Sequence, residues 1–422
     1  MKLLALVLFL LMYVLMIRFS AKRVWIVLTV AAVFLVSGIL PLSAVPGAIN
    51  WNVLLMIGGT MILVDYFIDS YMPNCIADSI LGKAGNVCMV TVLMSLFSGA
   101  VSAFMDNVAT VLMIAPVGLA ICRQLKISPV PMILSIAVSS NLQGAATLVG
   151  DTTSIMLGAY AHMDFMDFFW FRGRPGIFFA VELGALATVP IMLWLFRKDR
   201  DEVKSGRKTE VKEKISSALL LLLVATLIMA SFFPNKPDVT NGVICMSYAV
   251  LMMILDYFRT REPEHVKRAL RSVDYETLLL LTGLFLVIEG VTQAGLIEDF
   301  ADIIVRTGGD NLFLLFTIVV WGSVIVSAFV DNIPYVATML PVLTSVTSTL
   351  GIEPYLLYFG LLTGATLGGN LTPIGASANI TAVGLLKKNG YEVSFTDFMK
   401  IGVPFTLTAV MTGYLYLWFF WR

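Results

Sequence analysis

Long apolar stretches, separated by short polar segments, run along almost the whole chain. Ten of these stretches are long enough for a helix that crosses a bilayer at about 1.5 Å per residue. They cover residues 3–18, 23–43, 51–68, 129–162, 175–196, 215–233, 240–258, 275–295, 353–386 and 400–421. The pattern therefore predicts an all-α polytopic membrane protein with about ten transmembrane helices.

Two further apolar stretches, 86–122 and 310–350, are too long for one helix and are interrupted near their centres. The interruptions are Asp106 and Asn107 within SAFMDNVATVLMIAP, and Asp331 and Asn332 within SAFVDNIPYVATMLP. Hydrocarbon solvates neither a carboxylate nor a free backbone amide, so each polar pair needs a partner or a task. We predict two re-entrant hairpins, each made of two half-helices that meet at the polar pair.

The stretches 129–162 and 353–386 exceed one bilayer thickness and contain polar, glycine-rich breaks. The breaks read QGAATLVGDTTS at 143–154 and GATLGGNLTPIGASAN at 364–379. Broken helices of this kind usually flank a binding site near the middle of the membrane. We predict hinges at Gly150, Gly368 and Gly369, where glycine lets the backbone unwind and a ligand approach. The alternative is that the glycines only pack helices.

The two hairpin motifs lie 225 residues apart, which suggests a duplicated protein. WNVLLMIGG at 51–59 matches YETLLLLTG at 275–283 with an offset of 224, and ATLVGDTT at 146–153 matches ATLGGNLT at 365–372 with an offset of 219. The second match pairs Asp151 with Asn370. We predict an N-terminal repeat at 1–197, a cytoplasmic linker at 198–214 and a C-terminal repeat at 215–422. Five spans per repeat make the second repeat inverted, so the first hairpin enters from the cytoplasm and the second from outside.

Charge is sparse and lies mostly on one predicted side of the membrane. Charged residues make up 13% of the chain and hydrophobic residues 58%, with a mean hydropathy of +0.89, outside the range of soluble domains. With hairpins that do not cross, about 22 of the 28 Lys and Arg fall on one side. Cytoplasmic loops carry such an excess, so we predict both termini outside. The first apolar run has no small-residue cleavage site, which favours a retained helix over a signal peptide.

Polar residues at the hairpin tips and helix breaks are the candidate binding groups. They are Asp106, Asn107, Thr110, Asp151, Thr152, Thr153, Asp331, Asn332, Asn370, Thr372, Ser377 and Asn379. Carboxylate, amide and hydroxyl oxygens, with the free carbonyls of helix ends, suit Na⁺, and a carboxyl group kept from water binds a proton more readily. The expected Na⁺ ligands are Asp106, Asn107, Asp151, Asp331 and Asn332. The simpler alternative is that each Asp-Asn pair only caps the helix after it.

The hairpin motifs, together with GATLGGNLTPIGASANITAVG at 364–384, resemble signature segments of the ion transporter superfamily. The nearest branch contains arsenite permeases, NhaD-type antiporters and the melanosomal P protein, beside citrate transporter-like permeases. The resemblance implies inverted repeats, opposed hairpins, a homodimer and an elevator-like shift. GDTTS at 150–154 replaces the GDPPN of arsenite permeases and is closer to NhaD-type antiporters. The acidic tips, where dicarboxylate carriers have Ser-Asn-Thr, make a citrate-like substrate less favoured.

These observations predict a secondary active transporter of the inner or plasma membrane. We favour exchange of a cation, Na⁺, for protons by alternating access. The alternatives are ion-coupled transport of a small citrate-like or arsenite-like anion and, less favoured, an ion channel. No nucleophile-base pair, metal motif, phosphate-binding loop or nucleic-acid motif is present, so we expect no enzyme and no cofactor beyond a bound Na⁺. The expected partners are the lipid bilayer, a small ion and a second copy of the chain.

Overall fold

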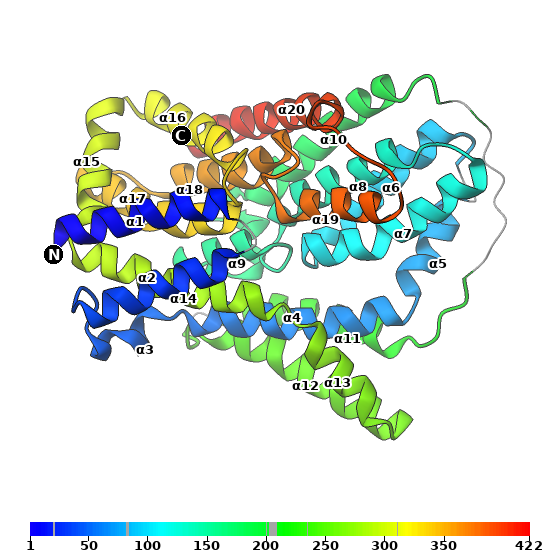
Figure 1. Ribbon diagram of the computed structural model, residues 1–422, viewed down its shortest axis with the longest axis horizontal. Coiled ribbons are helices and arrows are strands. Elements are labelled where there is room, and N and C mark those ends of the chain that lie inside the picture. Colours follow the sequence, from blue (N-terminus) through cyan, green and yellow to red (C-terminus); the bar gives the residue numbers. More distant parts are fainter. Residues whose placement is uncertain (20–21, 82–83, 200, 202–208, 234, 310) are drawn as a thin grey trace.

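The computed structural model describes residues 1–422 except 20–21, 82–83, 200, 202–208, 234 and 310 (Figure 1). Most of its long helices run along the horizontal axis of that view. In the described part, seven helices are long and apolar enough to cross a membrane. They are α4 (Trp51–Asp69), α7 (Asn107–Leu125), α10 (Ile177–Leu195), α12 (Thr240–Thr260), α14 (Tyr275–Gln293), α17 (Asn332–Leu350) and α20 (Phe395–Trp421). The chain is therefore an all-helical, multi-pass integral membrane protein.

The ten expected spans take three forms in the structure. Five of them are the single long helices α4, α10, α12, α14 and α20. Three contain shorter helices: α1 (Lys2–Arg18), α2 (Arg23–Val36) and α11 (Ile215–Ala230). The helix α2 ends early, before a turn in which Gly38 has a φ of +74°, a conformation that glycine adopts easily. The remaining two spans are broken helices.

Both expected hairpins are helix pairs that break at the Asp-Asn motif. The first is α6 (Val87–Ser102) followed by α7, and the second is α16 (Leu312–Ser327) followed by α17. In each pair the Asn begins the second helix and the Asp precedes it. The second arms are longer than the predicted half-helices, because 19 residues are enough to cross a bilayer. Pro116 and Pro341 lie inside these arms without ending them.

The spans expected at 129–162 and 353–386 are broken near their centres, which confirms that prediction. The first comprises α8 (Val130–Gln143), the 3₁₀ turn η3 (Gly144–Ala146) and α9 (Thr152–Tyr160). The second comprises α18 (Tyr355–Leu362), the π-helical turn η5 (Thr363–Leu367), the 3₁₀ turn η6 (Gly369–Leu371) and α19 (Ser377–Lys388). Each break thus replaces regular α-helix with tight turns and extended backbone.

Each break is tied to its own hairpin by the same contact. The hydroxyl of Thr147 donates to the carbonyl oxygen of Ala103, and the hydroxyl of Thr372 donates to that of Ala328. Both residues of the second contact lie 225 positions after those of the first. This register makes Asp151 equivalent to Ala376, so the predicted match of Asp151 with Asn370 is wrong. Two strings of the second break, ATLGG at 365–369 and LTPIG at 371–375, resemble ATLVG at 146–150, and only the backbone contacts distinguish the two registers.

Several short elements fall outside the apolar stretches because they are polar or amphipathic. They are η2 (Leu42–Ala44), α3 (Val45–Ala48), α5 (Met72–Leu81), η4 (Phe165–Phe168), α13 (Pro263–Ser272) and α15 (Leu296–Gly308). The strands β1 (Trp170–Phe171) and β2 (Arg174–Pro175) pair antiparallel, with Trp170 opposite Pro175. The pair α15 and α16 bends by 119°, and counting it as one span gives up to eight candidate spans in the described residues.

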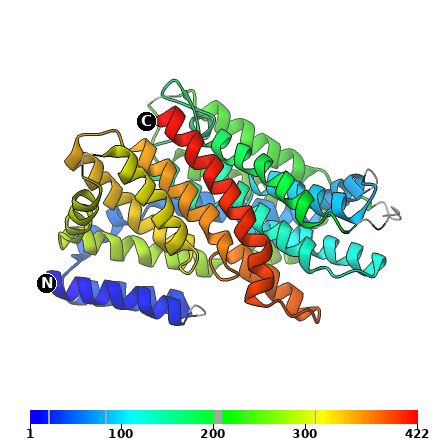
Figure 2. The same ribbon diagram turned by 90° about the horizontal axis from the view of Figure 1, so that it is seen from above.

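Helices of the two halves pack against each other throughout the bundle. The helix α4 packs along α12, α14 along α2, and α10 along α20. Figure 2 shows α20, in red, crossing the bundle diagonally. The predicted linker lies partly on residues outside the described part. In its described part, the backbone N–H of Lys212 donates to the carbonyl oxygen of Ser70 at 2.9 Å. The halves therefore share one apolar core and do not fold as separate domains.

Candidate transport site

Four helix starts meet around one cavity of about 390 Å³. The first residues of α7, α9, α17 and α19 all line this cavity: Asn107, Thr152, Asn332 and Ser377. Arg23 of α2, Met61 of α4 and the start of α14 complete its wall. A helix start presents unpaired N–H groups and a partial positive charge. Four of them together create a strongly polar centre inside an apolar bundle.

The predicted carboxylates cap three of these four helix starts. Each accepts a hydrogen bond from a backbone N–H of its helix: Asp106 from Ala109 at 3.0 Å, Asp151 from Thr152 at 2.8 Å and Asp331 from Ile333 at 3.1 Å. The residue before α19 is Ala376, which has no side-chain acceptor. Capping, the simpler alternative, is therefore present. Each carboxylate still keeps a second oxygen for another partner.

In the first half, Asp151 lies in a buried network. Its Oδ2 accepts a hydrogen bond from the hydroxyl of Thr153 at 2.8 Å, and its Oδ1 lies 3.4 Å from Nδ2 of Asn107. Asn107 also donates to Oδ1 of Asn141 at 3.0 Å. Asp151 is only 3% exposed, whereas Asp106 is partly exposed. Two carboxylates thus lie on the wall of one cavity.

In the second half, Asp331 has different partners. Its Oδ2 accepts hydrogen bonds from the hydroxyl of Ser377 at 3.0 Å and from Nη1 of Arg23 at 2.5 Å. Beside it, Nδ2 of Asn332 is buried without a hydrogen-bond partner among the described residues. A buried donor left unpaired costs about 1–3 kcal/mol. This amide is therefore suited to an acceptor oxygen of a bound species.

A network of amides and hydroxyls joins the two halves behind the cavity. Nδ2 of Asn141 donates to the carbonyl oxygen of Thr366 at 2.7 Å and to Oδ1 of Asn370 at 3.1 Å. The hydroxyls of Thr153 and Thr366 lie 2.9 Å apart. All four residues are buried. The two broken helices are therefore linked side by side near their breaks.

The structure separates the predicted binding residues into two sets. Those that line the cavity are Asp106, Asn107, Asp151, Thr152, Asn332 and Ser377. The others make hydrogen bonds within the hairpins and breaks: Thr110, Thr153, Asp331, Asn370, Thr372 and Asn379. Asp331 belongs with the first set in practice, because Arg23 and Ser377, which contact its carboxylate, both line the cavity.

The glycines predicted as hinges lie where two backbones approach closely. An added Cβ would come too near a neighbouring backbone atom in each case: 2.8 Å from the Ala103 oxygen at Gly150, 2.6 Å from Val324 Cα at Gly368, and 2.8 Å from the Gly375 oxygen at Gly369. Packing alone thus requires glycine at these three positions. Their role as hinges stays a prediction.

Sequence reasoning missed the part of the site that comes from other helices. In the sequence, Arg23 reads only as a loop charge at the start of an apolar span. Asp274 and Glu276 also line the cavity, and Asp274 caps α14 by accepting from the N–H of Thr277 at 3.0 Å. Sequence reasoning also missed Asn141. A signal for it was available, because its equivalent in the 225-residue register, Thr366, lies inside the second predicted break.

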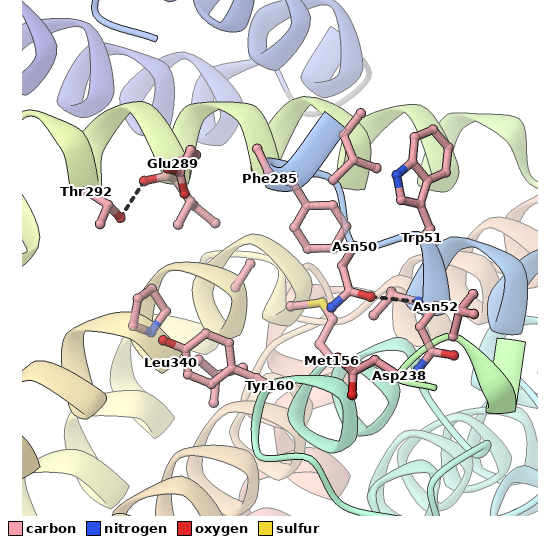
Figure 3. Close-up of a pocket in the computed structure, with 18 residues that line it drawn as sticks. Asn50, Trp51, Asn52, Met156, Tyr160, Asp238, Phe285, Glu289, Thr292 and Leu340 are labelled. Carbon is pink, nitrogen blue, oxygen red and sulfur yellow. Dashed lines mark hydrogen bonds between the residues drawn. The ribbon is translucent and has the colours of Figure 1, made fainter. Parts of the chain in front are cut away.

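A second cavity, of about 510 Å³, lies at the other end of α14 (Figure 3). Phe285, Glu289 and Thr292 of α14 line it, opposite Tyr160 of α9 and Leu340 of α17. The first cavity is lined instead by the residues at the start of α14. The two cavities therefore lie between the same helices and approach from opposite ends of the bundle.

Comparison with known proteins identifies the family. The model of the CitMHS family, described as a citrate transporter, matches residues 11–364 of the chain. The chain belongs to the CitMHS citrate transporter family. This CitMHS protein is 29% identical over 377 residues to an uncharacterized transporter of Mycobacterium tuberculosis, with 88% of this chain and 86% of that protein covered. The match confirms a membrane transporter, as predicted, and not an enzyme.

Two further comparisons extend the relationship. The CitMHS chain is 26% identical over 453 residues to the P protein of Homo sapiens, with 87% of this chain and 53% of that protein covered. The resemblance to the P protein is thereby confirmed. The YdaH transporter of Alcanivorax borkumensis superimposes with a TM-score of 0.59, covering 89% of this chain and 86% of that one. MtrF of Neisseria gonorrhoeae gives 0.57, with 87% and 80% covered. Both are 12% identical, so they show likeness of fold alone.

Proposed function

We propose that this CitMHS protein is a secondary active transporter that exchanges Na⁺ for protons, with Asp106 and Asp151 as the exchange site. The observation that carries the proposal is the excess of carboxylates in the first cavity. Asp106, Asp151, Asp274 and Glu276 line it, against one cationic side chain, Arg23, among the described lining residues. A cavity of that charge attracts cations and opposes anions.

The ligand atoms also suit a cation. Asp106 and Asp151 each use part of their carboxylate in capping, and Asn107 and Thr152 add amide and hydroxyl oxygens on the same wall. Oxygen ligands from unwound segments and helix ends are the usual Na⁺ environment in such transporters. The same carboxylates, removed from bulk water, can instead hold protons. Competition of Na⁺ and protons for one pair of carboxylates produces exchange.

The second candidate is ion-coupled transport of a small carboxylate, in line with the family description. The unpaired amide of Asn332 and the uncapped start of α19 at Ser377 offer donors to an anion. In this scheme the cations at Asp106 and Asp151 neutralise the cavity before the anion enters. An arsenite-like substrate has no comparable support.

For the architecture, we propose two inverted repeats, 1–197 and 215–422, joined by a cytoplasmic linker at 198–214. The matched contacts of Thr147 and Thr372 support it. Ends of different spans that this topology places on one side also touch: Lys2 pairs with Asp299 at 2.7 Å and Arg172 with Glu353 at 2.9 Å. Hairpin 86–122 then enters from the cytoplasm and hairpin 310–350 from outside, in about ten spans.

The loop charges support an orientation with both termini outside and the first cavity open to the cytoplasm. Figure 1 places both termini in the left half of the view. An inner or plasma membrane location and a homodimer complete the proposal, both carried over from the family resemblance. Blue-native electrophoresis and crosslinking of the protein in native membranes test the dimer.

Transport in proteoliposomes tests the function. With an imposed Na⁺ or pH gradient, wild-type protein is expected to exchange cations. Asp106→Asn and Asp151→Asn are expected to lower exchange about tenfold or more, since about 1.4 kcal/mol of lost ion binding already weakens affinity tenfold. The matched control is Asp302→Asn, an exposed acid of α15. Normal exchange in both cavity variants contradicts the site, and uptake of labelled citrate without Na⁺ or proton coupling contradicts the mechanism.

A further inference from the structure

The two hairpin tips carry equivalent carboxylates with different partners. Asp106 and Asp331 lie 225 positions apart, precede equivalent helices and make the same capping bond to the backbone. Asp331 also pairs with Arg23 at 2.5 Å, and no ion pair among the described residues involves Asp106. Of the two equivalent carboxylates, Asp106 is therefore open to ions, and Asp331 is already paired with a cationic side chain.

The asymmetry begins in the sequence. With the offsets of 224 and 225 found between the repeats, the positions equivalent to Arg23 are Ser247 and Tyr248, neither of which is cationic. The hydroxyl of Tyr248 lies 2.6 Å from that of Thr226 in α11, away from the hairpin tips. The second repeat thus supplies no arginine to the first hairpin, while the first repeat supplies Arg23 to the second hairpin.

The position of Arg23 is supported by a contact that the preceding helix, α1, makes with α17. The hydroxyl of Tyr13 in α1 donates to the carbonyl oxygen of Pro334 at 2.8 Å and lies 2.7 Å from the hydroxyl of Thr338. These bonds hold α1 against the first turns of α17. The chain then returns into α2 with Arg23 as its first residue, next to the tip that Asp331 occupies.

The pair is largely removed from solvent. The side chains of Arg23 and Asp331 are 24% and 14% exposed, and the hydroxyl of Ser377 also donates to the same carboxylate oxygen. A guanidinium group stays charged at all physiological pH values. A buried carboxylate that loses such a partner is left uncompensated and must bind another cation or a proton.

We propose that Arg23 is a tethered cation that fills the ion position of the second hairpin. The protein then binds exchangeable cations at the Asp106 and Asp151 site only, and Arg23 sets how many cations move in each cycle. The proposal rests on the proposed function, because it assumes that the first site binds Na⁺ or protons. It predicts that removal of Arg23 creates a second exchangeable site at Asp331.

The experiment counts cations on the purified, full-length protein. Equilibrium binding of ²²Na⁺ gives the Na⁺ bound at saturation, and a pH jump in a weakly buffered solution gives the protons exchanged. Arg23→Gln is expected to bind one more cation per protein than wild type, as Na⁺ or as a proton. Arg23→Gln combined with Asp331→Asn is expected to return to the wild-type count. Arg18→Gln, a neutralised exposed arginine at the end of α1, is the matched control and keeps the wild-type count.

Two results overturn the proposal. One is an unchanged cation count in folded Arg23→Gln protein, which indicates that the ion pair only holds α2 against the hairpin. The other is an extra cation that persists after Asp331 is also neutralised. If Arg23→Gln does not fold, Asp331→Asn alone decides: a wild-type count supports the tethered cation, and a count lowered by one contradicts it.

The same measurements separate this proposal from the proposed function. If wild-type protein binds no exchangeable cation and Asp106→Asn changes nothing, the proposed function itself fails. If Asp106→Asn loses a cation and Asp331→Asn loses one as well, the exchange site stands and only the tethered cation is wrong.

Discussion

Asparagine side chains link the two halves of this protein at its centre. Asn141 donates to Thr366 and Asn370 across the two halves and accepts from Asn107 at the first hairpin tip. Each of these bonds satisfies a group that would otherwise be buried and unpaired. Buried amides therefore tie the carboxylate caps of one half to the helix break of the other.

Asn141→Ala is expected to destabilise the protein by about 1–3 kcal/mol for each group left without a partner. The affected groups are the carbonyl of Thr366 and the side chains of Asn370 and Asn107. Thermal unfolding of the purified protein in detergent measures the loss. The matched control is Ser135→Ala in the same helix, since the Ser135 hydroxyl is buried without a partner among the described residues. Equal melting temperatures for the two variants contradict the network.

Each hairpin and the break beside it act as one unit at the scale of elements. Thr147 and Thr372 donate to Ala103 and Ala328, the residues that directly follow α6 and α16, and glycine lets the backbones meet. Gly150 lies against the carbonyls of Ser102 and Ala103, and Gly375 lies against those of Ser327 and Ala328. Because helix ends leave carbonyls unpaired, these contacts hold the tip and the break in a fixed relation.

Gly150→Ala and Gly375→Ala are expected to disrupt this unit in the same way. An added Cβ would lie 2.5 Å from the Gly144 oxygen in the first variant and 2.6 Å from the Gly369 oxygen in the second. Overpacking of this kind costs about 1–3 kcal/mol. Gly384→Ala in α19 is the control, because nothing lies within 4 Å of its added Cβ. Folded yield by fluorescence-detected chromatography measures the effect. Similar yields for all three variants contradict the close contact.

At the scale of the whole molecule, two cavities lie between the same helices, one toward each end of α14. Asp106, Asp151, Asp274 and Glu276 line the first cavity, and Glu289, Asp238, Tyr160 and Phe285 line the second. Both lie between α4 and α14 on one side and helices of the hairpins and breaks on the other. A carrier needs access to its site from both membrane faces in turn. The arrangement offers one approach from each face.

Single cysteines are expected to react from opposite membrane faces. After replacement of the four native cysteines, Thr381→Cys in the first cavity reacts with a membrane-impermeant maleimide from the cytoplasmic face, and Thr292→Cys in the second cavity reacts from the outer face. Ala409→Cys, which is fully buried in α20, reacts from neither. Labelling in right-side-out and in inverted vesicles measures from which face each cysteine reacts. Reaction of both cavity variants from the same face contradicts the orientation.

The sequence by itself determined the class of protein, the two helix pairs that break at an Asp-Asn motif, the two broken helices and six of the residues that line the first cavity. Hydrocarbon explains this success, since it forces the backbone into helices and allows polar residues only where they have a task. Asp106, Asn107, Asp151, Thr152, Asn332 and Ser377 are therefore conspicuous in any apolar stretch. The positions of most long helices were also readable, but the early end of α2, the length of α7 and α17 and the helices α5, α13 and α15 were not.

Only the tertiary structure decided how the polar groups are paired. The bond from Arg23 to Asp331 joins residues far apart in the chain, and no periodicity in the sequence predicts it. The register of the breaks makes Asp151 equivalent to Ala376 and not to Asn370. That register depends on the backbone contacts of Thr147 and Thr372. Local patterns report where a residue is relative to its own helix. Which carboxylate is free and which is neutralised depends on what the other half of the chain brings to it.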